Sequence, residues 1–236
     1  MTHAGKRVAV VIPALDEEAS IAAVVADFRA LGLVDEVVVV DNGSRDHTAE
    51  RARAAGARVV AEARRGYGAA LRRGIEEALA AGAELVALCE ADGTFAAAEL
   101  ARLLAPLDEV DLVLGSRAEH LAGALGLGNR LMARLVSALW PRRSIRLGDV
   151  GCTYRAFTAA TWHRLAPALD ADGPAFSPQM MCAAFGAGLA VRELSVRYGA
   201  RSGGSSKHTG DVRGVLRTAL VMLRAILRAR LRFVRS

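Results

Sequence analysis

The sequence predicts an α/β fold in which a mostly parallel sheet is flanked by helices. Two observations lead to this prediction. Short apolar runs alternate with segments of helical periodicity along the first half of the chain, which is the order that βαβ units produce. The first run, residues 8–12, is continuously apolar and rich in valine, as expected for a strand buried on both faces of a parallel sheet.

The elements follow one another at regular spacing after that first strand. Ile21, Val24, Val25 and Phe28 recur at helical spacing and Gly32 follows them, so a helix is expected to end there. The alternation then continues. Strands are predicted at residues 36–40, 57–61, 85–88 and 111–114, and helices at residues 48–55 and 69–81.

The second half of the chain is less regular. It predicts helices at residues 129–140 and 178–185, a strand at residues 189–198, a polar loop at residues 199–210 and a basic helix from Asp211. No internal repeat or linker indicates a domain break. We therefore expect residues 1–210 to form one domain, with residues 211–236 as a helix that belongs to it or docks on a membrane.

Composition limits the classes of protein that fit. Of 236 residues, 53% are hydrophobic and 24% charged, which excludes a disordered chain. The net charge of +6 indicates an anionic partner. Nucleic acid is not expected as that partner, because the sequence has no aromatic stacking residues and no known nucleic-acid-binding module.

Three widely spaced cysteines favour reduced core thiols. No signal peptide or apolar stretch of about 18 residues is present, so we expect a cytoplasmic protein, peripheral on the inner face of the membrane if it docks there.

Acidic segments follow three of the predicted strands: PALDEE, DNGSRD and EADGTF. Ligands of such sheets bind beyond the carboxyl ends of the strands. In an extended chain Glu90 and Asp92 would share a face, and their oxygens could hold Mg²⁺ or Mn²⁺ while a diphosphate and water complete the coordination. The alternative is a solvated turn in which Gly93 supplies the bend.

A resemblance adds to this pattern. The segments VVIPALDEE, VVVVDNGSRDHT, GYGAA, EADGTF, GSR and YGARSGGSSK stand in the order found in family 2 glycosyltransferases, and the chain resembles most the dolichol- or polyprenyl-phosphate mannose synthase branch. The match covers roughly residues 7–210. It implies a GT-A fold and a metal-dependent, inverting transfer of a sugar from a GDP- or UDP-linked donor.

The resemblance also implies roles for individual residues on the donor side. Glu90 and Asp92 stand where the family has its metal motif, with Glu in place of the usual first Asp, and Asp92 is thereby also a catalytic candidate. Thr94 stands where mannose synthases often have Gln, which leaves a third protein ligand in doubt. The remaining donor-side candidates are Pro13, Leu15 and Glu17 for the nucleotide pocket, Asp41 for the base or ribose, and Arg117 for the sugar and phosphates.

Several basic and small residues are candidates for contacts to phosphate. Gly66 and Gly68 precede a predicted helix, where they either only let the chain turn or help to hold an anion at the helix N-terminus. Arg155 resembles a family segment near the acceptor. Arg201 and Lys207 lie in a Gly/Ser-rich loop that could close over phosphates, or that is simply a solvated basic loop.

The class of acceptor that the protein can use depends on whether a side chain is available to remove a proton from it. A hydroxyl needs a positioned base, whereas a phosphate monoester, with a second pKa of about 6, is already a nucleophile at neutral pH. Asp149 is the best candidate for a base or an acceptor-orienting residue, although it could equally cap a loop. Gln179 stands where we expect Glu in many relatives, which favours a phosphate acceptor. Together with the resemblance and the basic C-terminal segments, this leads us to expect polyprenyl phosphate as the acceptor. A soluble glycan, protein or metabolite hydroxyl, and a non-catalytic nucleotide-sugar-binding protein, remain the alternatives.

The C-terminal helix is predicted to be amphipathic, with a basic side and an apolar side. The basic side consists of Arg213, Arg217, Arg224, Arg228 and Arg235, and the apolar side of Val215, Ala219, Met222, Ile226 and Phe233. Such a helix could lie on an anionic bilayer or pack on the domain with its arginines in water.

Overall fold

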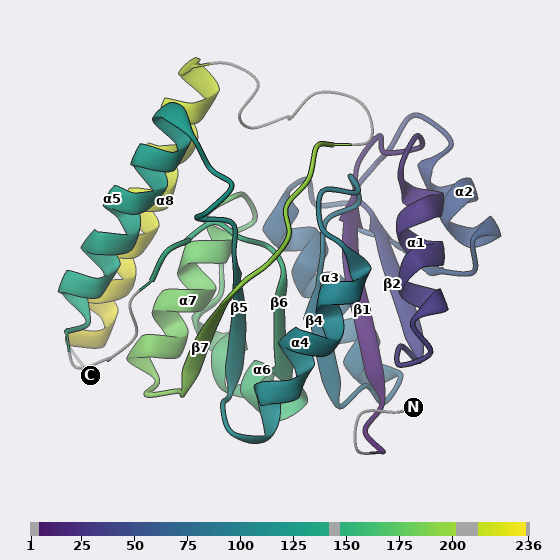
Figure 1. The fold of residues 1–236 in the computed structure, drawn as a ribbon, viewed down its shortest axis with the longest axis horizontal. Helices are drawn as coiled ribbons and strands as arrows, with labels where there is room; N and C mark the ends of the chain where they lie inside the picture. Colours follow the sequence, from purple (N-terminus) through teal and green to yellow (C-terminus); the bar gives the residue numbers. More distant parts are fainter. Residues whose placement is uncertain (1–4, 142–146, 202–211, 235–236) are drawn as a thin grey trace.

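The computed structural model of the chain describes residues 5–141, 147–201 and 212–234. These residues form a three-layer α/β arrangement in which one sheet lies between helices (Figure 1). The predicted Lys207, Arg235 and most of the loop at residues 199–210 lie outside the described residues.

The sheet has seven strands in the order β3-β2-β1-β4-β6-β5-β7. All neighbours pair in parallel except β6, which is antiparallel to both β4 and β5. The strands are β1 Val8–Ala14, β2 Glu36–Asp41, β3 Arg58–Ala61, β4 Leu85–Leu88, β5 Leu112–Ser116, β6 Arg155–Thr158 and β7 Val191–Ser195. The five strands predicted in the first half are confirmed, whereas the antiparallel β6 was not predicted from its sequence.

Helices cover both faces of this sheet. They are α1 Ile21–Ala30, α2 Thr48–Ala54, α3 Tyr67–Ala80, α4 Leu100–Leu104, α5 Gly123–Leu139, α6 Ala159–Leu165, α7 Phe176–Gly186 and α8 Val212–Val234, with short 3₁₀ turns at Ala97–Glu99, Ala105–Asp108 and Ala166–Ala168. The helix predicted at residues 129–140 begins earlier, at Gly123. Three glycines in its first turns weaken the local helical signal.

The core consists of two apolar layers, one on each face of the sheet. Along β1, Val8, Val10 and Ile12 belong to one layer, while Ala9 and Val11 belong to the other. All five side chains are fully buried, which confirms that this strand is covered on both faces. Cys89, Cys152 and Cys182 are also buried and unpaired, as expected for core thiols.

Gly74 of α3 permits close packing of that helix on the sheet. A Cβ atom there would lie 2.4 Å from Val11 Cγ1 and 2.7 Å from Val40 Cγ2. Alanine in a helix interior gains about 1 kcal/mol over glycine, but overpacking a core costs roughly 1–3 kcal/mol. We therefore expect Gly74→Ala to lower the free energy of unfolding by up to about 2 kcal/mol in denaturant titrations.

A matched control for that substitution lies in α5. A Cβ at Gly128 would meet no heavy atom within 4 Å, so Gly128→Ala should raise the free energy of unfolding, by up to about 1 kcal/mol. Equal effects of the two substitutions would contradict the packing explanation.

The C-terminal helix α8 packs on the domain, against α7 and α5 (Figure 1). Ile226, from the predicted apolar side, is fully buried, and Ala219 and Met222 line a cavity. The side chains of Arg213, Val215 and Phe233 are outside the described set. The domain therefore covers Ile226 on this side of the helix, and docking of the helix on a bilayer stays a prediction. None of the described helices has the length and hydropathy needed to span a membrane.

Candidate active site

A cavity of about 710 Å³ opens at the carboxyl edge of the sheet. Its wall includes residues at the carboxyl ends of β1, β2, β4 and β5 or within four residues beyond them: Pro13, Leu15, Glu17, Asn42, Glu90, Asp92 and Arg117. Parallel strands bring these segments together because their carboxyl ends share one edge. Six candidates from the donor side of the sequence prediction thus line one cavity, and Asp41 does not.

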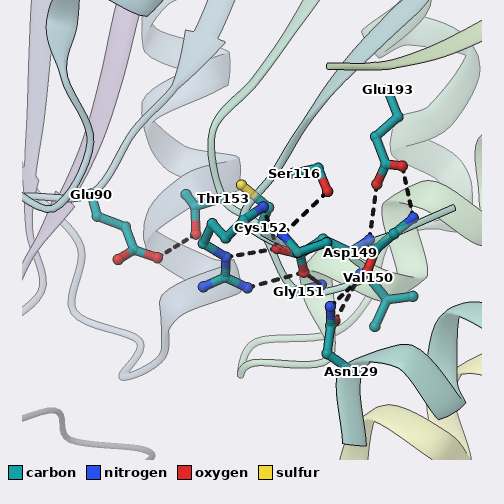
Figure 2. A network of polar contacts seen from close by, with 12 residues as sticks. Glu90, Ser116, Asn129, Asp149, Val150, Gly151, Cys152, Thr153 and Glu193 are labelled. Carbon is teal, nitrogen blue, oxygen red and sulfur yellow. Dashed lines mark hydrogen bonds and ion pairs between the residues drawn. The ribbon is translucent and has the colours of Figure 1, made fainter. Parts of the chain in front are cut away.

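The two predicted metal ligands both lie on the cavity wall. Glu90 Oε1 accepts a hydrogen bond of 2.6 Å from Thr153 Oγ1, which in turn accepts one of 2.6 Å from the Tyr67 hydroxyl (Glu90 and Thr153 are seen in Figure 2). Asp92 Oδ1 accepts from Thr94, from its amide at 3.0 Å and its hydroxyl at 2.7 Å. Burial and the neighbouring charge of Asp92 raise the pKa of Glu90, so a cation here would relieve an unfavourable pair.

Arg201 also lines the cavity and contacts this acidic group. Its Nη1 donates to Asp92 Oδ2 at 3.0 Å, and its Nη2 bonds Glu17 Oε1. A guanidinium therefore already stands between two of the carboxylates. The donor set consists of hard oxygen atoms, which suits Mg²⁺ or Mn²⁺. Among the residues that the structure describes, no three His, Cys, Asp or Glu side chains form a metal-binding group, so other oxygens would have to come from a ligand or water.

Arg117 is held in place by Asp149. The carboxylate accepts from Arg117 Nε at 2.7 Å, from its Nη2 at 3.1 Å and from its amide at 3.0 Å, and Gly151 N donates to it at 2.9 Å. Burial would raise the pKa of Asp149, but the hydrogen bonds and charge of Arg117 outweigh it and hold that pKa below its ordinary value. Arg117 also lies 5.4 Å from the centre of the Tyr198 ring.

The interpretation of Asp149 as a base must therefore be corrected. Its side chain is fully buried and does not line the cavity, and a carboxylate that is kept ionised by an arginine is a weak proton acceptor. Asp149 orients Arg117, which does line the cavity, so its contribution to any reaction is indirect.

The loop that carries Asp149 is itself anchored by residues that sequence reasoning missed. Glu193 of β7 accepts from the amides of Gly148 at 2.7 Å and Asp149 at 2.9 Å, and Asn129 of α5 bonds Gly148 O at 2.7 Å and Val150 N at 3.2 Å (Figure 2). One feature of the sequence could have pointed to Asn129, because it is a polar residue inside an apolar helical segment. Glu193, Tyr67 and Thr153 had no comparable signal.

Two predicted phosphate ligands have structural roles instead. Arg155 is 2% exposed and donates to the backbone carbonyls of Cys152 at 2.8 Å and Ser177 at 2.6 Å, so it is not available to an acceptor. Gly68 lies against the loop that holds Asp172, whose carbonyl accepts the Gly68 amide at 2.6 Å. The start of α3 is thereby closed to an anion at this position.

Gly66, Asp41 and Gln179 are likewise engaged with their neighbours. The Gly66 amide donates to Asn42 Oδ1 at 2.7 Å, although Gly66 does line the cavity. Asp41 Oδ1 accepts from Ser44 N at 3.1 Å and acts as a turn cap. Gln179 accepts from the amide of Ala171 at 2.9 Å and so holds the loop that packs on α3.

The fold and the cavity define the class of protein. A cavity at this edge of an α/β sheet, with carboxylates and three arginines (Arg65, Arg117 and Arg201) on its wall, suits a phosphorylated ligand bound with a cation. Residues 9–163 match the sequence model of the protein family described as "Glycosyl transferase family 2". The chain belongs to this family and is a glycosyltransferase of GT-A fold that uses a nucleotide sugar.

The relatives of the chain cover most of its length. It is 38% identical over 231 residues to an uncharacterised glycosyltransferase of Mycobacterium tuberculosis H37Rv, a match of 89% of this chain and 94% of the relative. It is 32% identical over 211 residues to glycosyltransferase AglJ of Haloferax volcanii, a match of 87% of this chain and 67% of that protein.

Solved structures of glucosyl-3-phosphoglycerate synthase from Mycobacterium tuberculosis are also similar. One, in complex with Mn²⁺, UDP-glucose and phosphoglyceric acid, is 27% identical with a TM-score of 0.75 and covers 96% of this chain and 80% of its own. Another contains Mg²⁺ and UDP and is 25% identical with a TM-score of 0.73. These structures do not support the mannose synthase branch in particular, which stays a prediction.

Proposed function

We propose that the chain transfers a sugar, with inversion, from a UDP- or GDP-linked donor in a reaction that depends on Mg²⁺ or Mn²⁺. Glu90 and Asp92 would hold the cation, which when bound supplies the Lewis acidity that neutralises the departing diphosphate. The metals and UDP in the related synthase structures support this proposal. The non-catalytic alternative loses support because both carboxylates line the cavity.

The residues around that pair have complementary tasks. Pro13, near the end of β1, and Leu15 and Glu17, just beyond it, form the wall expected to contact the nucleotide. Arg117, oriented by the buried Asp149, presents a fixed guanidinium to the phosphates, since a bidentate pair restricts its rotation. Arg201 must exchange at least part of its contact with Asp92 for a phosphate when a cation binds there.

The lining of the cavity favours an acceptor that is both anionic and apolar. Besides the polar wall, the same cavity is lined by side chains of α5 and α8, namely Leu121 just before α5, Leu125, Met132, Ala219 and Met222. A small sugar phosphate has no apolar group to place there, whereas a polyprenyl phosphate has both parts. This is the observation on which the acceptor proposal depends.

A phosphate acceptor also agrees with the position of Asp149. A phosphate monoester has a second pKa of about 6 and so needs no base at neutral pH. Asp149 is unavailable as a base because both of its carboxylate oxygens accept hydrogen bonds from Arg117. Transfer to a phosphate requires only that Arg117 and the neighbouring residues position the two substrates.

The second candidate is a soluble phosphorylated metabolite. The related synthase structures contain phosphoglyceric acid, and an anionic metabolite would satisfy the same arginines. This candidate differs from the first because it makes no use of the apolar side chains of α5 and α8.

Parallel assays with two acceptors test the proposal. Release of UDP or GDP is measured with a short-chain polyprenyl phosphate in detergent and with 3-phosphoglycerate. We expect faster transfer to the polyprenyl phosphate, and about a tenfold or larger loss of kcat/KM in Met222→Gln, because a buried apolar contact of this size contributes roughly 1.5–3 kcal/mol. Hydrolysis of the donor alone should be unaffected by that substitution. Faster transfer to 3-phosphoglycerate, insensitive to Met222, would support the second candidate instead.

A further inference from the structure

The exposed large hydrophobic side chains of the described residues all lie on two adjacent helices. They are 42–63% exposed and consist of Leu125, Leu127 and Leu131 on α5 and Leu220, Leu227 and Leu231 on α8. The two helices contact each other at one edge of the domain (Figure 1). A concentration of this kind on one edge indicates an interaction surface, since single exposed leucines are normally scattered.

The spacing of these leucines produces a stripe on each helix. On α8, Leu220, Leu227 and Leu231 are separated by seven and four residues, so they lie along one side. On α5, Leu127 and Leu131 are one turn apart. The opposite sides of both helices are buried in the core through Val136 and Ile226. The exposed stripes therefore differ from the apolar side predicted for the C-terminal helix.

Arginines accompany the leucines on both helices. Besides Arg232, which pairs with Asp170, the exposed ones are Arg130 and Arg134 on α5 and Arg217, Arg224 and Arg228 on α8. None of the five forms an ion pair with a carboxylate in the described part of the chain. Neither helix contains Asp or Glu. These leucines and arginines together form what we call the leucine–arginine face.

We propose that the leucine–arginine face docks on an anionic lipid bilayer. Exposed leucines can enter the interface between headgroups and acyl chains, while arginines attract anionic headgroups. A second copy of the chain fits less well, because two copies meeting through this face would oppose arginines without any acidic partner.

The position of the face deepens the proposed function, on which this part of the inference rests. Leu125 is 42% exposed and also lines the active-site cavity, so the face borders the apolar wall of the cavity. Docking would place this wall beside the bilayer, from which the chain of a lipid phosphate could enter.

Vesicle binding of the full chain tests the proposal. Its partition is measured by co-sedimentation with phosphatidylcholine vesicles that contain or lack phosphatidylglycerol, at low and high salt. The test variant Arg217→Gln/Arg224→Gln/Arg228→Gln should bind the anionic vesicles about a hundredfold more weakly, at roughly fivefold for each arginine. A second variant, Leu227→Gln/Leu231→Gln, should also bind more weakly.

The matched control removes the same charge from other surfaces. Arg7, Arg45 and Arg53 are exposed and lie outside α5 and α8, so Arg7→Gln/Arg45→Gln/Arg53→Gln should retain the greater part of the binding. Failure of the unmodified chain to bind anionic vesicles at low salt would overturn the proposal, and so would equal weakening by the control.

Two further measurements separate membrane docking from self-association and from the proposed reaction. Light scattering that shows a dimer lost in Leu227→Gln/Leu231→Gln, without vesicle binding, would assign the face to self-association instead. Asp92→Asn should bind vesicles like the unmodified chain. Vesicle binding therefore tests the docking face even if the proposed reaction proves wrong.

Discussion

Asp92→Asn should lower kcat/KM for metal-dependent release of nucleotide from the donor by on the order of 10²–10³-fold, the loss seen when one electrostatic contact to a transition state is removed. The amide keeps an oxygen for the two hydrogen bonds from Thr94, so the local turn should persist. What it loses is the negative charge that a divalent cation requires. The measurement is the initial rate of nucleotide release as a function of Mn²⁺ concentration.

An exposed carboxylate supplies the control for that substitution. Asp27 lies on the solvent side of α1, so Asp27→Asn makes the same chemical change away from the cavity and should leave the rate unchanged. Thermal unfolding of both variants checks that they are folded. Full turnover by Asp92→Asn, at any Mn²⁺ concentration, would contradict the assignment of this residue as a metal ligand.

Asp149→Ala should lower the free energy of unfolding by about 3 kcal/mol, because removal of one partner from a buried ion pair leaves the other charge uncompensated. The side chain of Asp149 is fully buried and that of Arg117 is 15% exposed. Turnover should fall as well, since Arg117 would lose the carboxylate that orients it. Denaturant titration and steady-state kinetics measure the two effects separately.

A double variant distinguishes the structural effect from the functional one. Arg117→Met/Asp149→Leu replaces the ion pair by apolar side chains, which often restores stability, but it should not restore turnover. Recovery of turnover in the double variant would show that Arg117 has no role in the reaction.

The stability contributed by Asp149 should also depend on pH. The pKa of Asp149 is held below its ordinary value in the folded state. Its contribution to stability is therefore present above the unfolded pKa and is lost as pH falls through the folded pKa.

Most of the fold could be predicted from local patterns. The run at residues 8–12 and the periodic segment that ends before Gly32 are governed by side-chain spacing, which the chain shows directly. The antiparallel β6 gave no such signal, because direction in a sheet depends on which neighbours are available. The early start of α5 at Gly123 was missed because the three glycines of its first turns have low helix propensity.

The sequence by itself determined the parallel βαβ order and the acidic segments that follow the strands, because both depend on residues close together in the chain. Only the tertiary structure decided the partners of long polar side chains: Asp149 binds Arg117, Arg155 binds backbone carbonyls, and Arg201 reaches Asp92. It also decided which side of α8 the domain covers. Such choices depend on contacts between distant residues, where burial makes an unpaired charge costly and thereby selects one partner.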